Sequence, residues 1–95
     1  MNYRISKKCF NKINSFYKNV AKKYKHTYSE DMLHNSVDET IDSMYKIEKE
    51  LLRRTPTIEQ WQGYYMANTE KWYFAYTVID NTVNIVDACH AQNMH

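Results

Sequence analysis

The 95-residue chain has few of the residues that break regular structure, with one glycine (Gly63) and one proline (Pro56). A glycine-rich phosphate loop and a collagen-like repeat both need far more glycine, so both are excluded. A disordered tail is excluded too, because 43% of the residues are hydrophobic and 15% are aromatic. No apolar run approaches the roughly 20 residues that span a bilayer. We therefore expect one folded domain over residues 1–95.

Cysteine is also scarce. Cys9 and Cys89 lie far apart and form no CxxC motif. They could join the two ends of the chain by a disulfide, but the lack of a secretory leader favours reduced thiols in a cytoplasmic protein. A metal site of Cys89, His90 and His95 is disfavoured, because adjacent residues on a strand point to opposite faces. We predict no metal and no cofactor.

Acidic residues are absent from the first 25 positions, although the net charge of the whole chain is only +2. This segment carries Arg4, Lys7, Lys8, Lys12, Lys18, Lys22, Lys23 and Lys25. Residues 26–60 are acidic on balance. A one-sided basic segment indicates a polyanion or an acidic partner surface. The alternative is a solvated lysine-rich helix face packed beside an acidic helix.

The N-terminal half predicts a short strand and two helices. Residues 2–6 alternate in polarity, and Ser6 can cap a helix over about residues 7–24. Ser29 can cap a second helix, which ends with Arg53 and Arg54 in its last turn before Pro56. The apolar stripe of that second helix comprises Leu33, Val37, Ile41, Met44, Ile47 and Leu51.

The C-terminal third predicts three strands, at residues 61–67, 72–79 and 82–90. Asp80 and Asn81 form a two-residue turn between the last two. Residues 72–79 are apolar on both faces, which indicates a central strand. The predicted fold is therefore α+β, in the order β-α-α-β-β-β, with a helical hairpin packed on a mostly antiparallel sheet.

The element order, the lysine-rich first helix and the run from Lys71 to His90 resemble the RelE/ParE family of toxins from bacterial type II toxin–antitoxin systems. In that family the run is a strand ending in tyrosine, a turn entry similar to Val-Ile-Asp, a Val/Ile-rich strand and often a histidine just after it. The resemblance covers nearly the whole chain in element order. Its most specific part is residues 71–90.

The resemblance implies a toxin neutralised by a cognate antitoxin protein, as a free monomer or in a toxin–antitoxin hetero-oligomer, with no membrane association. Toxins of the RelE branch enter the ribosomal A site and cut mRNA, so this branch implies a ribosome-dependent mRNA endonuclease, which is the function that we predict first. The ParE branch instead inhibits DNA gyrase without a nuclease site. A degenerate toxin that binds only its antitoxin is a third alternative.

Two residues are candidates for catalysis. His90 ends the last strand, where we expect it to be accessible, to titrate near neutrality and to act as a general acid. The alternative is that His90 is a surface histidine with no catalytic role. Tyr73 stands where the family usually has arginine, and Tyr64 and Met66 replace expected basic residues. Because phosphoryl transfer needs cations, these replacements favour the inhibitor alternative.

The remaining candidates bind substrate or antitoxin. Phosphate contacts are expected from Lys71, Arg53 and Arg54, and base stacking from Tyr64 and Tyr65. For the tyrosines, a cross-strand aromatic ladder is the alternative. The antitoxin is expected to place an acidic segment on the first helix, over Lys12, Lys18, Lys22 and Lys23.

Overall fold

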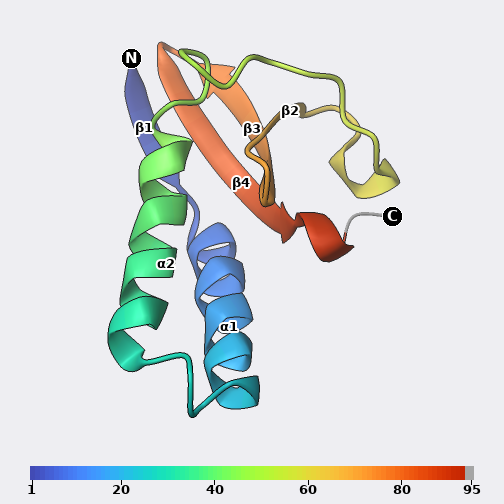
Figure 1. Cartoon of the computed structure of the whole chain (residues 1–95). Coiled ribbons are helices and arrows are strands. Elements are labelled where there is room, and N and C mark those ends of the chain that lie inside the picture. Colours follow the sequence, from blue (N-terminus) through green and yellow to red (C-terminus); the bar gives the residue numbers. More distant parts are fainter. Residues whose placement is uncertain (94–95) are drawn as a thin grey trace.

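The computed structural model describes residues 1–93 and has an α+β fold (Figure 1). Two helices and four strands follow each other in the predicted order, so the α+β class is confirmed. The elements are β1 (Asn2–Ile5), α1 (Lys7–Lys23), α2 (Glu30–Met44), the 3-10 turn η1 (Glu59–Trp61), β2 (Tyr65–Asn68), β3 (Trp72–Ile79), β4 (Thr82–His90) and the 3-10 turn η2 (Ala91–Asn93). No helix within residues 1–93 is long and apolar enough to cross a bilayer.

The four strands form one sheet in the order β1-β4-β3-β2. β1 runs parallel to β4, and the other two pairs are antiparallel. β3 is therefore an interior strand, as its apolar faces predict. Asp80 and Asn81 turn between β3 and β4 with positive φ angles of 50° and 60°, which confirms the predicted turn.

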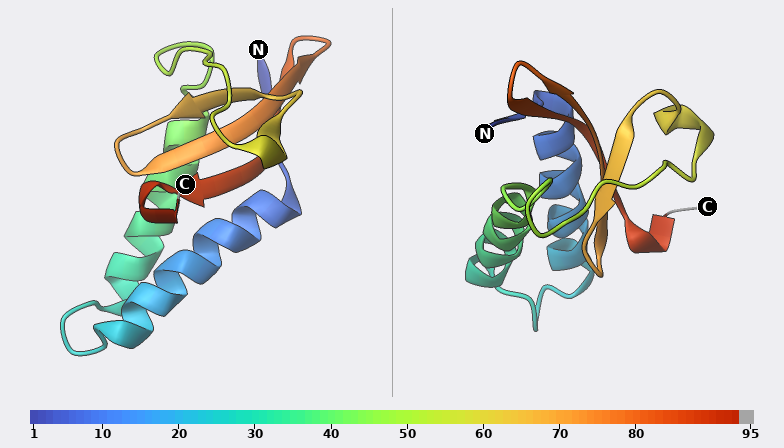
Figure 2. Two further views of the ribbon diagram at one scale, coloured as in Figure 1. Left: turned by 90° about the vertical axis from the view of Figure 1, so that its right-hand side faces the viewer. Right: turned by 90° about the horizontal axis from the view of Figure 1, so that it is seen from above.

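Both helices begin at the predicted serine caps. The Ser6 hydroxyl accepts a hydrogen bond from the Cys9 backbone N–H at 3.0 Å, and the Ser29 hydroxyl accepts one from the Met32 N–H at 3.2 Å. The inner faces of the helices bury Cys9 and Ile13 from α1 and Met44 from α2. Figure 2 shows both helices on one face of the sheet and the η1 segment on the other.

The second helix is shorter than predicted, and its predicted end at Arg54 is wrong. α2 stops at Met44, and the chain turns at Glu48, whose φ is +70° and whose N–H donates to the Leu51 carbonyl at 2.9 Å. Ile47 reaches the core from this turn and is fully buried. The apolar spacing that predicted a longer helix therefore reflects only that Ile47 is buried, and a residue in a turn can be buried as fully as one in a helix.

The strand predicted over residues 61–67 is also corrected, because β2 begins only at Tyr65. Trp61 lies in η1 and is 2% exposed, packed with Met66 and Ala75 on the face of the sheet away from the helices. Gly63, with φ of +91°, turns the chain from η1 toward β2. The sequence alone does not distinguish a tryptophan buried in a 3-10 turn from one buried in a strand.

Candidate functional site

His90 lies on the helix-covered face of the sheet, at the end of β4. Its imidazole stacks on the Phe16 ring with centroids 4.1 Å apart and planes 12° apart. The ring of Trp72, its partner across the sheet, meets it edge-on at 5.2 Å. The sheet face at His90 is therefore not open as expected, although the histidine stays partly exposed. α1 covers that face, and His90 is half-buried.

The surroundings of His90 favour its neutral form. Burial lowers the pKa of the imidazole below its ordinary 6.5, and the nearby Lys71 ammonium lowers it further. The Nδ1 atom accepts a hydrogen bond from the Gln92 backbone N–H at 3.2 Å, so the neutral ring carries its proton on Nε2. A general acid must be protonated, and this environment reduces the protonated fraction at neutral pH.

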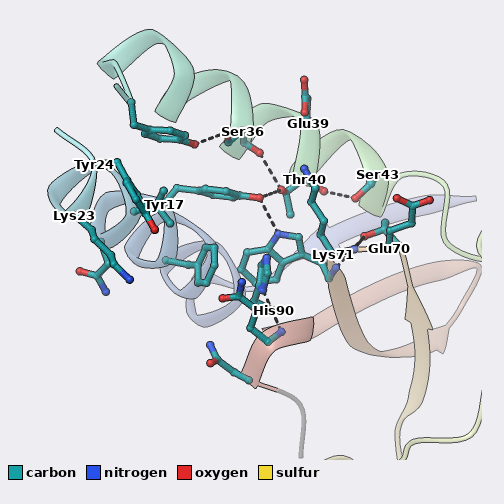
Figure 3. Close-up of a pocket in the computed structure, with 18 residues that line it drawn as sticks. Tyr17, Lys23, Tyr24, Ser36, Glu39, Thr40, Ser43, Glu70, Lys71 and His90 are labelled. Atoms are coloured by element: carbon teal, nitrogen blue, oxygen red, sulfur yellow. Dashed lines mark hydrogen bonds between the residues drawn. The ribbon is translucent and has the colours of Figure 1, made fainter. Parts of the chain in front are cut away.

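A chain of hydrogen bonds joins the two helices to β3 beside His90 (Figure 3). The Trp72 indole N–H donates to the Tyr17 hydroxyl at 3.0 Å, and the Tyr17 hydroxyl lies 3.4 Å from that of Thr40. Thr40 donates onward to the Ser36 carbonyl at 2.9 Å. Because the Thr40 proton is used there, Tyr17 is the donor to Thr40, and every donor in the chain has an acceptor.

These residues line a groove of about 1090 Å³ between the helical hairpin, the β2–β3 turn and η2. The close-up shows Lys23 at the α1 side, while the Lys71 side chain extends toward Thr40 of α2 (Figure 3). Glu39 and Glu70 also contribute to the lining, so the groove carries both signs of charge. The groove therefore offers aromatic rings, hydroxyls and two ammonium groups to a ligand.

Tyr73 lies on the opposite face of the sheet from His90. It pairs with Cys89 across the β3–β4 ladder, and both pack against the Trp61 cluster. The two candidate catalytic residues are therefore not brought together. Cys89 and His90 point to opposite faces, as the strand alternation predicts. No group of three metal-ligating side chains occurs within residues 1–93, and His95 lies outside the described residues.

Arg53 and Tyr65 lie together at the other end of the sheet. The Arg53 guanidinium donates to both carboxylate oxygens of Glu48, at 3.0 and 2.7 Å, and lies 3.8 Å from the centroid of the Tyr65 ring. The buried Tyr76 donates its hydroxyl proton to the same carboxylate at 2.5 Å. The Arg53 hydrogen bond lowers the pKa of Glu48, burial opposes this, and the Tyr76 hydrogen bond lowers it further.

Glu48, which accepts hydrogen bonds from both Arg53 and Tyr76, was not among the residues predicted from the sequence. In the predicted helix Glu48 would lie within the apolar stripe, four residues after Met44 and three before Leu51, but nothing in the sequence pattern pairs it with Arg53 or Tyr76. The sequence offers two signals: a carboxylate inside an apolar stripe, and an arginine five residues after it, a separation that matches no helical neighbour spacing.

Arg54 and Tyr64 remain apart from both groups. Arg54 pairs with Met66 of β2 through two backbone hydrogen bonds, of 2.7 and 3.0 Å. This isolated antiparallel bridge lies along the outer edge of β2. Its guanidinium donates to the Asn68 side-chain oxygen at 2.6 Å. Tyr64 is 38% exposed just before β2. These residues line the outer edge of β2, and none of their contacts includes His90.

The lysines of α1 also divide into separate groups. Lys12 forms an ion pair of 2.9 Å with Asp87, a residue that also accepts from the Trp61 indole N–H at 2.9 Å. Burial would raise the pKa of Asp87, but the hydrogen bonds from Lys12, from Trp61 and from its own strand keep it below the ordinary value. Lys12 therefore stabilises the fold. Lys18 and Lys22 are exposed on α1.

The candidate residues thus lie in four places: His90 with Lys71 at the groove, Arg53 with Tyr65 at the other end of the sheet, the lysines on α1, and Tyr73, Arg54 and Tyr64 on the far face or outer edge of the sheet. No family model, curated protein or solved structure matches the chain. A function has to be proposed from the chain's own residues and their arrangement.

Proposed function

We propose that the chain is the toxin of a type II toxin–antitoxin system and that it acts by binding a protein target such as DNA gyrase, without cutting RNA. The element order and the basic α1, which resemble the RelE/ParE family, support the toxin class. The separation of His90 and Tyr73 on opposite faces of the sheet carries the choice of mechanism.

Phosphoryl transfer requires an acid, a base and cations within hydrogen-bond reach of one phosphate. Of the candidate cations, Lys71 alone influences the pKa of His90. Arg53 is engaged by Glu48 at the far end of the sheet. Two groups on opposite faces of one sheet cannot contact the same phosphate without a change of fold. A surface that only binds a protein target does not need an acid, a base and cations to meet at one phosphate.

A RelE-like mRNA endonuclease is the second candidate, because one observation favours it. His90 and Lys71 line the same groove as the rings of Phe16 and Trp72. Aromatic rings and an ammonium group are what a single-stranded nucleic acid needs for stacking and for phosphate contact, at about 1–3 kcal/mol for each stacked base. In this candidate, His90 would act with Lys71 and without Tyr73.

The cognate antitoxin is proposed to place an acidic segment on the exposed lysines of α1. Lys18 and Lys22 are exposed and suit this role. Lys12 is paired with Asp87, and Lys23 lines the groove, so we propose Lys18 and Lys22 as the main contacts. Long-range attraction between a basic helix and an acidic segment raises the rate of association and makes it dependent on salt.

Two assays on the purified protein separate the candidates. The first measures DNA supercoiling by gyrase, and the second maps mRNA ends on translating ribosomes. We expect inhibition of supercoiling and intact mRNA. Cleavage of mRNA that disappears in His90→Ala would instead support the endonuclease. A protein that leaves both processes unchanged, and whose induction in bacteria does not slow growth, would contradict the toxin proposal.

A further inference from the structure

The two helices present opposite charges on their exposed faces. On α1 the exposed residues include Lys7, Lys8, Lys18 and Lys22, and the helix contains no acidic residue. On α2 they include Asp31, Asp38, Glu39 and Asp42, and the helix contains no lysine or arginine. Figure 1 shows the helices side by side along one side of the molecule, so a basic and an acidic stripe lie next to each other.

These stripes are not neutralised by each other. Within residues 1–93 the ion pairs join Lys8 and Lys12 to Asp87, and Arg53 to Glu48. None of them connects α1 with α2. The charges of α2, and those of Lys18 and Lys22 on α1, are therefore available to a partner that carries both signs in the same arrangement.

We propose that this partner is a second copy of the chain, and that two copies pair through their helical layers. In a twofold dimer each copy must present the same surface to the other. An axis perpendicular to the helices would place α1 on α1 and α2 on α2, which sets like charges against each other. An axis parallel to the helices places α1 of each copy on α2 of the other. Charge complementarity selects the second arrangement.

The positions of the charges along the helices fit this arrangement. Residues 24–29 connect the end of α1 to the start of α2, so Lys22 and Asp31 lie at the same end of the hairpin. At a rise of about 1.5 Å per residue, Lys18 lies at nearly the height of Asn35 and within reach of Asp38. By the same count, Lys7 lies about 6 Å beyond the height of Asp42, which is within reach of a lysine side chain. The axis preserves these heights, so each lysine group of one copy meets an acid of the other.

The dimer is expected to be weak and dependent on salt. Exposed ion pairs contribute little individually, and the proposed interface consists mainly of such pairs. Met32, which is 45% exposed on α2, adds apolar contact among the acids. The dimer uses the same lysines as the proposed antitoxin dock, so an acidic partner would compete with the second copy.

Sedimentation velocity on the full chain tests the dimer. We expect self-association at about 0.05 M salt and monomers at about 1 M, because the screening length falls from above 10 Å to about 3 Å. The double variants Lys18→Glu/Lys22→Glu and Asp38→Lys/Asp42→Lys should each weaken self-association about tenfold or more. At positions 18, 22, 38 and 42 each variant then carries one sign of charge on both helices.

An equimolar mixture of the two variants is the decisive sample. Mixing places acidic side chains at these four positions of one variant against basic side chains of the other, so association should return to about the wild-type level. The control Glu50→Lys/Glu59→Lys makes the same charge change as the α2 variant at exposed positions outside α1 and α2 and should behave as wild type, with circular dichroism confirming folding. A mixture that stays monomeric, or a wild type that is monomeric at low salt, would overturn the dimer.

The α2 variant also separates this inference from the proposed function. Asp38→Lys/Asp42→Lys leaves every lysine of α1 in place, so it should lose self-association and keep any binding of an acidic segment to Lys18 and Lys22. Failure of the toxin assays with intact self-association would leave the dimer standing. Loss of self-association alone would leave the toxin proposal standing.

Discussion

The two ends of β3 make different kinds of contact with the rest of the chain. At the Tyr76 end, a buried hydroxyl, the Glu48 carboxylate and the Arg53 guanidinium form one charge-assisted network. At the Trp72 end, aromatic rings and neutral hydroxyls pack against a neutral His90. Bonds to charged groups are roughly twice as strong as neutral ones. The comparison indicates that the Tyr76 end contributes more to stability, while the Trp72 end, which borders the groove, is accessible to ligands.

Removing one hydroxyl at each end tests this contrast most strongly. Tyr76→Phe removes a hydrogen bond to a charged carboxylate and should lower the free energy of unfolding by about 1.5–3 kcal/mol. Tyr17→Phe removes a neutral acceptor of the Trp72 N–H and should cost about 0.5–1.5 kcal/mol. Urea denaturation of both variants measures the difference.

Tyr3→Phe is a useful control, because the Tyr3 hydroxyl donates to the neutral Ile47 carbonyl at 2.6 Å, near the Tyr76 end. Its cost should match that of Tyr17→Phe. If Tyr17→Phe were as costly as Tyr76→Phe, the two ends would not differ in the way described.

The two ends should also lose stability in different ranges of pH. The folded pKa of His90 lies below its unfolded 6.5, so its contribution is complete above 6.5 and is lost as the pH falls through the lower folded value. The folded pKa of Glu48 lies below its unfolded 4.5, so its contribution is present above 4.5 and is lost at more acidic pH. Unfolding measured from neutral to acidic pH should show a small loss first and a larger one later.

Two variants assign these steps. His90→Phe keeps a ring between Phe16 and Trp72 but does not titrate, so the first loss should disappear. Glu48→Gln should reduce the second loss without abolishing it, because the folded pKa of Asp87 is also lowered from 3.8 and that carboxylate contributes in the same acidic range. A first loss that persists in His90→Phe would contradict the assignment.

Local signals in the sequence predicted most of the fold. Ser6 and Ser29 cap the helices because their hydroxyls satisfy free backbone N–H groups of the first turn, a requirement set by nearby residues alone. The length of α2 was not predictable in this way. Ile47 is buried from a turn that the Tyr3 hydroxyl holds across 44 positions of sequence. Helical spacing does not distinguish such a contact from another helical turn.

The site was less predictable, because it depends on register and on distant pairs. Strand alternation placed Cys89 and His90 on opposite faces, but relating His90 to Tyr73 required the β3–β4 register, which sets Trp72 opposite His90. The burial of His90 depends on Phe16 of α1, far away in the sequence. No local pattern contains that information.

Nuclear magnetic resonance of the His90 imidazole tests the central claim most directly, namely that this residue is a neutral packing group between Phe16 and Trp72. Titration of nitrogen-15 shifts in the full chain gives both its pKa and its tautomer, with His90→Phe to assign the signals. The account predicts a pKa below 6.5 and a neutral ring protonated on Nε2. A pKa at or above 6.5, or a neutral ring protonated on Nδ1, would contradict it.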